Sequence, residues 1–421
     1  MRKLAAFFIF SAIVLVLSCE KDNGAQDNGG VTYRLTQAKS PKRGVGYNNP
    51  VLPDQDLPLI GPAISWAYNW SSNGPSGELD EAFAKYGVSF VPMLWNGNWN
   101  ADNIRAFKSS HPEAQYILAF NEPNLTDQAN MTPSKAAEFW PAVVSIAKET
   151  GLKIISPALN YGTLDGYHDP VKWLDEFLAQ PGVSLDDIDG IALHCYMPAA
   201  ASVSQFLNLF SKYNKPLWLT EFCNGNSNNI SEDAQLMYLC ETLNMLEGRS
   251  DVAGYAWFMM RGGFNSRWHN NLLTSQPPIE LTTLGTVFVN FSTFDKTIFY
   301  KVGDVIPAEQ YVAASGTVHL APSTDGGVLD ISKLGRDGWV EYQLDIAKAG
   351  TYKLQLRYQT FSDASLLFSL DGADVASKRI PNTEKVWKTS SFDIDLPVGR
   401  SVLRVTGNSG APVALNWLRI K

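Results

Sequence analysis

The pattern of apolar and polar residues changes once along the chain, close to residue 300. Before that point, short and nearly continuous apolar runs alternate with longer segments in which apolar residues recur at helical spacing. After it, apolar and polar residues alternate with a period of two. The first pattern is typical of parallel strands buried on both faces and separated by helices, and the second of antiparallel strands with one solvated face.

Eight apolar runs in the first part predict buried strands. They cover residues 43–48, 63–69, 89–95, 115–122, 153–159, 188–196, 216–222 and 252–258. Amphipathic segments lie between most of them; one runs from Pro133 to a glycine at 151, as helices prefer. Eight strand–helix units in about 250 residues predict an α/β fold, the (β/α)8 TIM barrel. A doubly wound open sheet is the alternative, but it would more often carry a glycine-rich phosphate turn after its first strand, which this chain lacks.

The second part predicts an all-β antiparallel sandwich of jelly-roll type. In the segment TYKLQLRYQ, for example, one face would carry Tyr352, Leu354, Leu356 and Tyr358. Glycine and aspartate mark the turns between such segments. The change of pattern therefore separates a barrel domain at 41–300 from a sandwich domain at 305–421.

The N-terminus resembles the signal of a bacterial lipoprotein. Arg2 and a lysine precede an apolar run that ends in VLSC at Cys19. The run is shorter than the about 20 residues that span a bilayer. We expect residues 1–18 to be removed, Cys19 to be lipidated, and residues 19–40 to form a flexible tether, with an ordinary secretory signal as the alternative. The protein is thus predicted to be extracytoplasmic, held at the outer membrane or cell surface by its lipid alone.

Composition narrows the range of partners. The formal net charge is −8, and no lysine- and arginine-rich stripe is long enough to follow a phosphate backbone, which argues against nucleic acid. With 12 Trp, 16 Tyr and 21 Phe, the chain holds more aromatic residues than a core alone usually requires. We expect a monomer that binds its substrate through some of these aromatic side chains.

Three cysteines follow Cys19: Cys195, Cys223 and Cys240. Their spacing fits no zinc-binding pattern. In an oxidising compartment one pair could form a disulfide, but buried free thiols fit the sequence equally well.

The ends of the predicted strands carry the candidate chemistry, because the C-terminal strand ends of a barrel surround one pocket. Strand four ends in Asn121-Glu122 and strand seven in Glu221, so two carboxylates would approach from opposite sides of the barrel mouth. The other strand ends supply aromatic, amide and imidazole side chains: Tyr47, Asn48, Trp66, Tyr68, Asn69, Trp95, His194, Tyr196 and Trp257.

Two carboxylates among aromatic and amide side chains are what glycosidic cleavage requires. One carboxyl protonates the departing oxygen while the other attacks the anomeric carbon, and aromatic rings stack on the apolar faces of sugars. A lone glutamate at a strand end is usually a cap or an ion-pair partner, whereas the joint occurrence on strands four and seven favours catalysis. We expect the charge of Glu221 to raise the pKa of Glu122 and hold it protonated as the acid.

The phrases RGVGYN, WAYNW, ILAFNEPN, IALHCYMP, LWLTEF and GYAWF together resemble glycoside hydrolase family 128, the Asl1-like catalytic domains of the retaining barrel clan, over about 41–297. The resemblance implies cleavage of β-1,3-glucan of the laminarin and curdlan type. It implies Glu122 as acid/base and Glu221 as nucleophile, Asn121 at the 2-hydroxyl of the sugar, and His194 and Tyr196 near the nucleophile. It implies neither metal nor organic cofactor.

The phrases IPAEQYVAASG, GWVEYQLDIAKAGTYKLQLRY, VWKTSSFDIDLPVG and ALNWLRI resemble family 6 carbohydrate-binding modules. This chain departs from that family in two places. The opening Glu-x-Glu of a structural calcium site is Pro307-Ala308-Glu309 here, which argues against calcium, and the aromatic residue expected shortly before Trp339 is absent. Sugar binding and a purely structural sandwich both remain open.

The sequence therefore predicts a retaining, endo-acting β-1,3-glucanase. Alternatives are another specificity of the same clan, such as xylan, mannan or β-1,4-glucan, and a non-catalytic glycan-binding protein at the cell surface. Strand-end glutamates do not separate the specificities, because linkage preference depends on the loops. The presence of both glutamates argues against the non-catalytic alternative.

Overall fold

The computed structural model describes residues 37–421 except 49–50, 226 and 263–265. The predicted signal segment, Cys19 and most of the predicted tether lie outside the described residues. Within them, no helix is both long enough and apolar enough to cross a lipid bilayer.

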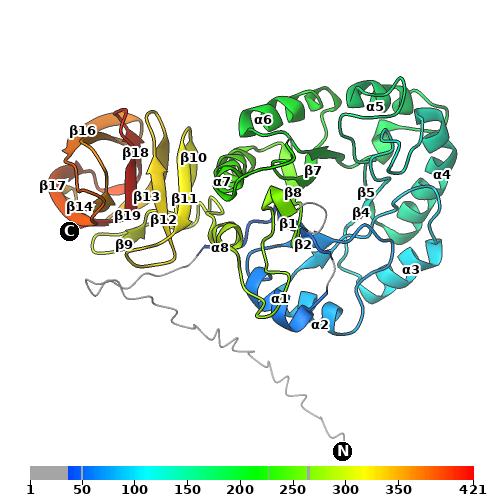
Figure 1. Ribbon diagram of the computed structural model, residues 1–421, viewed down its shortest axis with the longest axis horizontal. Helices are drawn as coiled ribbons and strands as arrows, with labels where there is room; N and C mark the ends of the chain where they lie inside the picture. The colour runs from blue at the N-terminus through cyan, green and yellow to red at the C-terminus, as the bar shows by residue number, and fades with distance from the viewer. Residues whose placement is uncertain (1–36, 49–50, 226, 263–265) are drawn as a thin grey trace, which may run out of the picture.

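The first part of the chain is an α/β domain, with each predicted strand present but shorter than its apolar run. The strands are β1 Arg43–Gly46, β2 Trp66–Tyr68, β3 Ser89–Phe90, β4 Tyr116–Leu118, β5 Lys153–Ile155, β6 Ile191–Cys195, β7 Leu217–Phe222 and β8 Val252–Trp257. The helices are α1 Pro53–Ile60, α2 Glu78–Tyr86, α3 Ala101–Ser110, α4 Pro133–Thr150, α5 Pro170–Leu178, α6 Ala200–Asn208, α7 Glu232–Gly248 and α8 Thr283–Asn290. Figure 1 shows these helices placed around the strands.

All strand pairs of this domain are parallel. One sheet has the order β3-β2-β1-β8-β7-β6, and β4 pairs with β5. Single parallel bridges join Met93 to Leu118 and Ile155 to Gly190, and so link the β4–β5 pair to its neighbours in the chain on both sides. The C-terminal ends of all these strands therefore point the same way, as the prediction of a shared pocket requires.

Two packing layers position the site. A cluster on the side of the strands away from the helices, the inner cluster, is formed by alternate residues, such as Leu118, Ala192 and Trp218, while their chain neighbours pack against the helices. Side-chain caps hold the starts of several helices; at α4, for example, the Thr132 side chain accepts from the backbone of Lys135. The layering leaves the strand ends free to carry polar side chains.

The C-terminal part is all-β with antiparallel sheets. Its strands are β9 Val305–Pro307, β10 Ala313–Ser315, β11 Val318–Pro322, β12 Leu329–Leu334, β13 Trp339–Ile346, β14 Gly350–Gln359, β15 Ala364–Leu370, β16 Ala373–Ile380, β17 Lys388–Leu396, β18 Gly399–Gly407 and β19 Val413–Ile420. One sheet has the order β10-β13-β18-β15-β16 and the other β11-β12-β19-β14-β17, with β9 beside β19. The face predicted from alternation is confirmed in β14, where Leu354, Leu356 and Tyr358 are buried.

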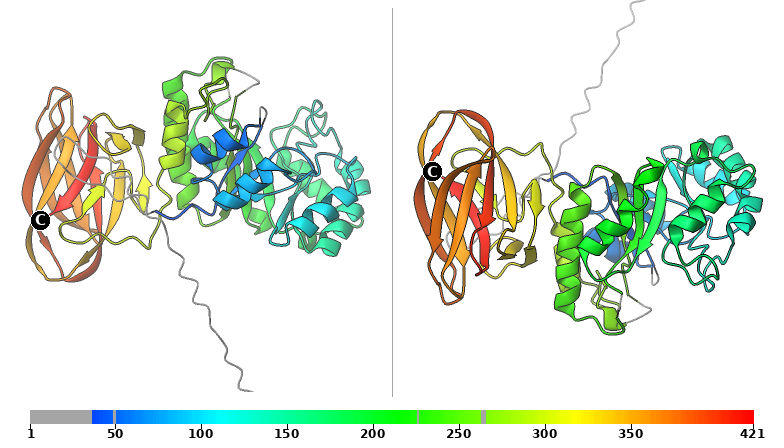
Figure 2. Two further views of the ribbon diagram at one scale, coloured as in Figure 1. Left: turned by 90° about the horizontal axis from the view of Figure 1, so that it is seen from below. Right: turned by 90° about the horizontal axis from the view of Figure 1, so that it is seen from above.

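The two parts meet along α7 and α8, which lie on the side of the α/β domain that faces β10 and β11 (Figures 1 and 2). The Tyr311 hydroxyl donates to Oδ1 of Asn244 over 2.9 Å, and the backbone of Leu320 donates to Sγ of Cys240 over 3.3 Å. All three described cysteines are buried free thiols. The sequence left a disulfide and buried free thiols equally open, and the structure has the free thiols.

Candidate active site

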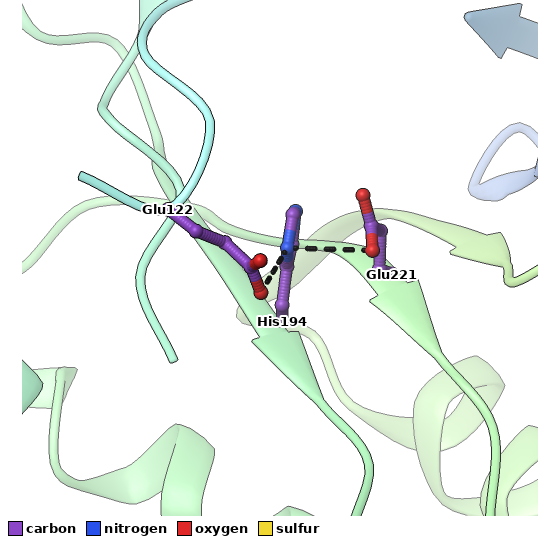
Figure 3. Close-up of side chains that lie close together, drawn as sticks. All are labelled: Glu122, His194 and Glu221. Atoms are coloured by element: carbon purple, nitrogen blue, oxygen red, sulfur yellow. Dashed lines mark hydrogen bonds and ion pairs between the residues drawn. The ribbon is translucent and has the colours of Figure 1, made fainter. Parts of the chain in front are cut away.

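The carboxylates of Glu122 and Glu221 lie on either side of the His194 imidazole (Figure 3). Glu122 follows β4, His194 lies in β6 and Glu221 in β7. Nδ1 of His194 is 2.9 Å from Oε1 of Glu122 and 3.5 Å from Oε2 of Glu221. One ligand atom from each of the three residues falls within 4.8 Å of the others. Two carboxylates this close match the spacing of about 5–5.5 Å for retaining glycosidases, and not the about 6.5–9.5 Å of inverting ones.

Glu221 accepts hydrogen bonds on both of its oxygens. The Tyr68 hydroxyl donates to Oε1 over 3.1 Å, and the indole Nε1–H of Trp70 donates to the same oxygen over 2.7 Å. The Tyr196 hydroxyl donates to Oε2. Three neutral donors thus surround one buried carboxylate and stabilise its ionised form.

Burial and the carboxylate of Glu122 raise the pKa of Glu221 above its usual value. The charge of His194 and the hydrogen bonds from Tyr196 and Trp70 act in the opposite direction. For His194 itself, burial lowers the pKa, but the charges of Glu221 and Glu122 outweigh it and leave the pKa raised. The nearby carboxylates thus favour an imidazolium at His194, and the charge of His194 in turn favours the ionised form of Glu221.

The backbone at Glu122 is in the left-handed region, with φ of 43°. This conformation is uncommon for a residue with a Cβ and tends to occur at functional sites. It turns the chain sharply after β4 and leaves the carboxylate facing His194, with Nδ2 of Asn160 at 3.5 Å from Oε1. The strained turn therefore aims the side chain at the shared pocket.

Several predicted site residues carry buried polar atoms without a protein partner. These are Oδ1 of Asn69, Oδ1 of Asn121 and Nε2 of His194. Buried polar groups are nearly always hydrogen-bonded, so these three atoms are candidates for contact with a bound hydroxyl or water. Trp95 is half-buried and packs against the inner cluster of the strands.

Other predicted site residues lie elsewhere, and the structure corrects them. Trp257 is fully buried on the helix side of β8, packs edge-on against Phe222 and donates from Nε1 to the Asn270 carbonyl. Tyr47 is buried beside α2, and its hydroxyl donates to Asp56 over 2.7 Å. Neither side chain reaches the pocket, because Trp257 in β8 and Tyr47, directly after β1, both pack on the helix side of the strands.

Trp66 and Asn48 are also engaged in packing. Trp66 starts β2, two residues before Tyr68, so it lies about 6–7 Å farther from the C-terminal ends of the strands. Its Nε1 donates to the Lys42 carbonyl over 2.9 Å. Asn48 exchanges hydrogen bonds with the backbone of Arg261 and so holds the segment after β8 in place.

Sequence reasoning missed Trp70 and Asn160. Trp70 comes after the end of β2, where strand alternation no longer predicts direction, and its backbone is left-handed with φ of 59°. Asn160 lies five residues past the end of β5. The second tryptophan of WAYNW was the one available signal for Trp70.

Glu122, His194 and Glu221 offer oxygen and nitrogen donors close enough for a divalent ion. The hydrogen bonds from Tyr68, Trp70 and Tyr196 already occupy most lone pairs of Glu221. We therefore assign the cluster to acid–base chemistry and not to metal binding. A surface pocket of about 460 Å³ between the starts of α7 and α8 is lined by Glu232 and His269, which are exposed, and contains none of the predicted site residues.

Comparisons with known proteins agree with this geometry. A family model described as the glycosyl hydrolase catalytic core matches residues 44–288. Alkali-sensitive linkage protein 1 of Schizosaccharomyces pombe is 25% identical over 263 residues, which are 60% of this chain and 45% of that protein, so the chain spans less than half the length of this relative.

Two solved structures cover the same part of the chain. A family 128, subgroup II endo-β-1,3-glucanase from Pseudomonas viridiflava is 40% identical with a TM-score of 0.54, over 60% of this chain and 98% of that one. A second enzyme of the same subgroup, from Sorangium cellulosum, is 33% identical with a TM-score of 0.51, over 59% of this chain and 97% of that one.

Proposed function

The chain belongs to glycoside hydrolase family 128, and from that membership we propose that it is an endo-acting, retaining hydrolase of β-1,3-glucan of the laminarin or curdlan type. The observation that carries the proposal is the pair of buried carboxylates, Glu122 and Glu221, with oxygens no more than 4.8 Å apart around His194. The similar enzymes from Pseudomonas and Sorangium act on β-1,3-glucan, which supports the linkage.

In the proposed mechanism, Glu221 is the nucleophile and Glu122 the acid/base. An oxygen of Glu221 bonds to the anomeric carbon as the bond to the departing sugar breaks, and the proton of Glu122 passes to the departing oxygen. Water then gives a proton to Glu122 and attacks the anomeric carbon, which releases Glu221. Two inversions leave the configuration of the product unchanged.

The surroundings of the two carboxylates suit these roles. Glu221 must be ionised to attack, and the charge of His194 together with the hydrogen bonds from Tyr196 and Trp70 opposes the effect of burial on its pKa. In this scheme the Oδ1 of Asn121 accepts from the 2-hydroxyl of the sugar and the Oδ1 of Asn69 from another hydroxyl, which is supported by the absence of a protein partner for either buried oxygen. No metal or organic cofactor takes part in this scheme.

We also propose that the eight strands close into a (β/α)8 barrel that extends over about 41–300, in line with the fold expected for such a site. The ladder from β8 to β1 and the bridges on both sides of the β4–β5 pair support this closure.

The C-terminal strands, from 305 to 421, are proposed to form a domain like the family 6 carbohydrate-binding modules. A pocket of about 280 Å³ on its surface is lined by polar side chains and by the exposed ring of Phe361, and is our candidate sugar site. The test compares full-length Glu221→Gln protein with the Glu221→Gln, Phe361→Ala double variant. Insoluble curdlan should remove less of the double variant from solution. Equal depletion would leave the sandwich a structural role.

We expect no calcium in this domain. Pro307 and Ala308 supply no carboxylate beside Glu309, and burial raises the pKa of Glu309 to about 8, so that its carboxyl is largely neutral at pH 7. A chelator should therefore leave the Tm unchanged.

For the N-terminus we propose a lipid anchor at Cys19 that holds a monomer on the extracytoplasmic side of the membrane. Metabolic labelling with a fatty acid should mark the full-length protein and not a Cys19→Ala variant. Label in both proteins would place the modification elsewhere.

The function is tested by reducing-sugar release from laminarin and from a panel of xylan, mannan and β-1,4-glucan. We expect activity on laminarin, a series of oligosaccharides as first products, and a loss of about three or more powers of ten in Glu221→Gln. Activity on another polymer alone would change the specificity. Glucan binding without any product would favour the non-catalytic alternative.

A further inference from the structure

Trp70 contacts the proposed nucleophile directly. Its indole Nε1–H lies 2.7 Å from Oε1 of Glu221, closer than the Tyr68 hydroxyl at 3.1 Å on the same oxygen. An indole N–H only donates and does not titrate, so this contact holds the carboxylate without adding a charge or a competing proton.

The position of the indole is fixed from three sides. The left-handed backbone at Trp70 turns its side chain back over β1, where Gly46 has no Cβ; a Cβ there would stand 2.9 Å from the ring. The Phe258 ring meets the indole edge-on with centroids 6.0 Å apart, and the Tyr68 ring lies 5.0 Å away. Phe258 also packs edge-on against Tyr196 at 5.4 Å, so one ring supports donors to both oxygens of Glu221.

The two oxygens of Glu221 differ in what faces them. Oε1 is held by Trp70 and Tyr68, on the side of β2. Oε2 accepts from the Tyr196 hydroxyl and lies 3.5 Å from Nδ1 of His194, which in turn contacts Glu122. A sugar held between the two carboxylates therefore meets Oε2.

We propose that Trp70 is a positioning residue that fixes Oε1 of Glu221 and thereby presents Oε2 as the oxygen that attacks the anomeric carbon. The inference rests on the proposed function, because it assumes that Glu221 is the nucleophile. Gly46 contributes to this positioning, because the absence of its side chain makes room for the indole.

The test removes the N–H and keeps a ring. In Trp70→Phe, kcat on laminarihexaose should fall roughly ten- to hundred-fold, as expected for the loss of a hydrogen bond to a charged group, while KM changes little. The acid limb of the pH profile of kcat/KM should move to higher pH, because the lost donor favoured the ionised carboxylate. The charged and titratable groups that also face Glu221 stay in place in this variant: Glu122, His194, Tyr68, Tyr196 and Cys223.

Trp387→Phe is the matched control, because it also loses an indole hydrogen bond, to Oγ1 of Thr324 in the C-terminal part. It should leave both kcat and the acid limb unchanged on this soluble substrate. Gly46→Ala is a second route, since it keeps the indole N–H but displaces the ring. It should reproduce the lower kcat and the shifted acid limb.

A Trp70→Phe enzyme with kcat within twofold of the wild type and the same acid limb would overturn the inference. So would a Gly46→Ala enzyme with the wild-type profile. A wild-type protein without activity on any β-glucan would instead overturn the proposed function, so the two failures are distinguishable.

Discussion

Nδ1 of His194 lies 2.9 Å from Oε1 of Glu122, and both residues are almost fully buried, as is Glu221. The same Nδ1 also lies 3.5 Å from Oε2 of Glu221. The charge of His194 lowers the pKa of the Glu221 carboxyl, against the effects of burial and of the neighbouring Glu122 carboxylate. His194 therefore controls the charge of the site.

Replacing His194 with Asn should move the acid limb of kcat/KM to higher pH. Glu221 must be ionised for attack, its pKa is already raised by burial, and the charge of His194 lowers it again. Without the imidazolium, ionisation of Glu221 is complete only at higher pH, and activity at a given acidic pH falls. The pH profile on laminarihexaose measures the shift. His168→Asn, at an exposed histidine outside the site, should keep the wild-type profile.

Replacing Glu122 with Gln should slow glucan cleavage by roughly 10²–10⁴-fold, the usual contribution of general acid catalysis. An aryl laminarioside whose phenol leaves without protonation should lose much less in its first step. The rates on the two substrates measure the role of Glu122 as acid in the first step. The effect of added azide, a nucleophile that needs no general base, measures its role as base in the second step. Glu113→Gln, at an exposed glutamate, is the control. An equal loss on both substrates would remove Glu122 from the acid role.

The ion pair of Arg43 and Glu247 should contribute strongly to stability. Nη2 of Arg43 is 2.8 Å from Oε1 of Glu247, and both side chains are at most 2% exposed. Glu247→Ala leaves a buried charge without its partner, which should lower the free energy of unfolding by about 3–5 kcal/mol. The exposed pair of Lys135 and Glu138 is the comparison, and Glu138→Ala should cost no more than about 1 kcal/mol. Urea unfolding followed by circular dichroism compares them, and similar losses would contradict the assignment.

The three described cysteines should be unreactive until the protein unfolds. Cys195, Cys223 and Cys240 are buried, and burial raises the pKa of each thiol, to about 11 for Cys195. In a chain that starts at residue 37, a chromogenic thiol reagent should detect none in the native protein and three in denaturant. One thiol in denaturant would reveal a disulfide.

The sequence predicted the strands and the two carboxylates because both depend on local signals. An apolar run that ends in Asn-Glu-Pro marks the end of β4 whatever the exact register, and the comparisons confirm the enzyme class. The direction of each aromatic side chain was less predictable. The runs are almost continuously apolar, so they do not show which alternate residues face the pocket, and Trp257 and Tyr47 were assigned to the wrong side.

The contribution of Trp70 could not be derived from pattern for a different reason. Its direction depends on a left-handed backbone beyond the strand and on the gap at Gly46, which lies 24 residues earlier in the chain. Such a contact arises only when β1 and β2 are paired. The free thiols likewise depend on which surfaces α7 and the strands bury, and not on cysteine spacing.

The central claim is that Glu122 and Glu221 carry out a double displacement. The most direct test is the anomeric configuration of the first product released from a linear β-1,3-glucan oligosaccharide, followed by proton NMR before mutarotation. A double displacement should release the β-anomer first, with the α-anomer appearing only later. Initial formation of the α-anomer would contradict it.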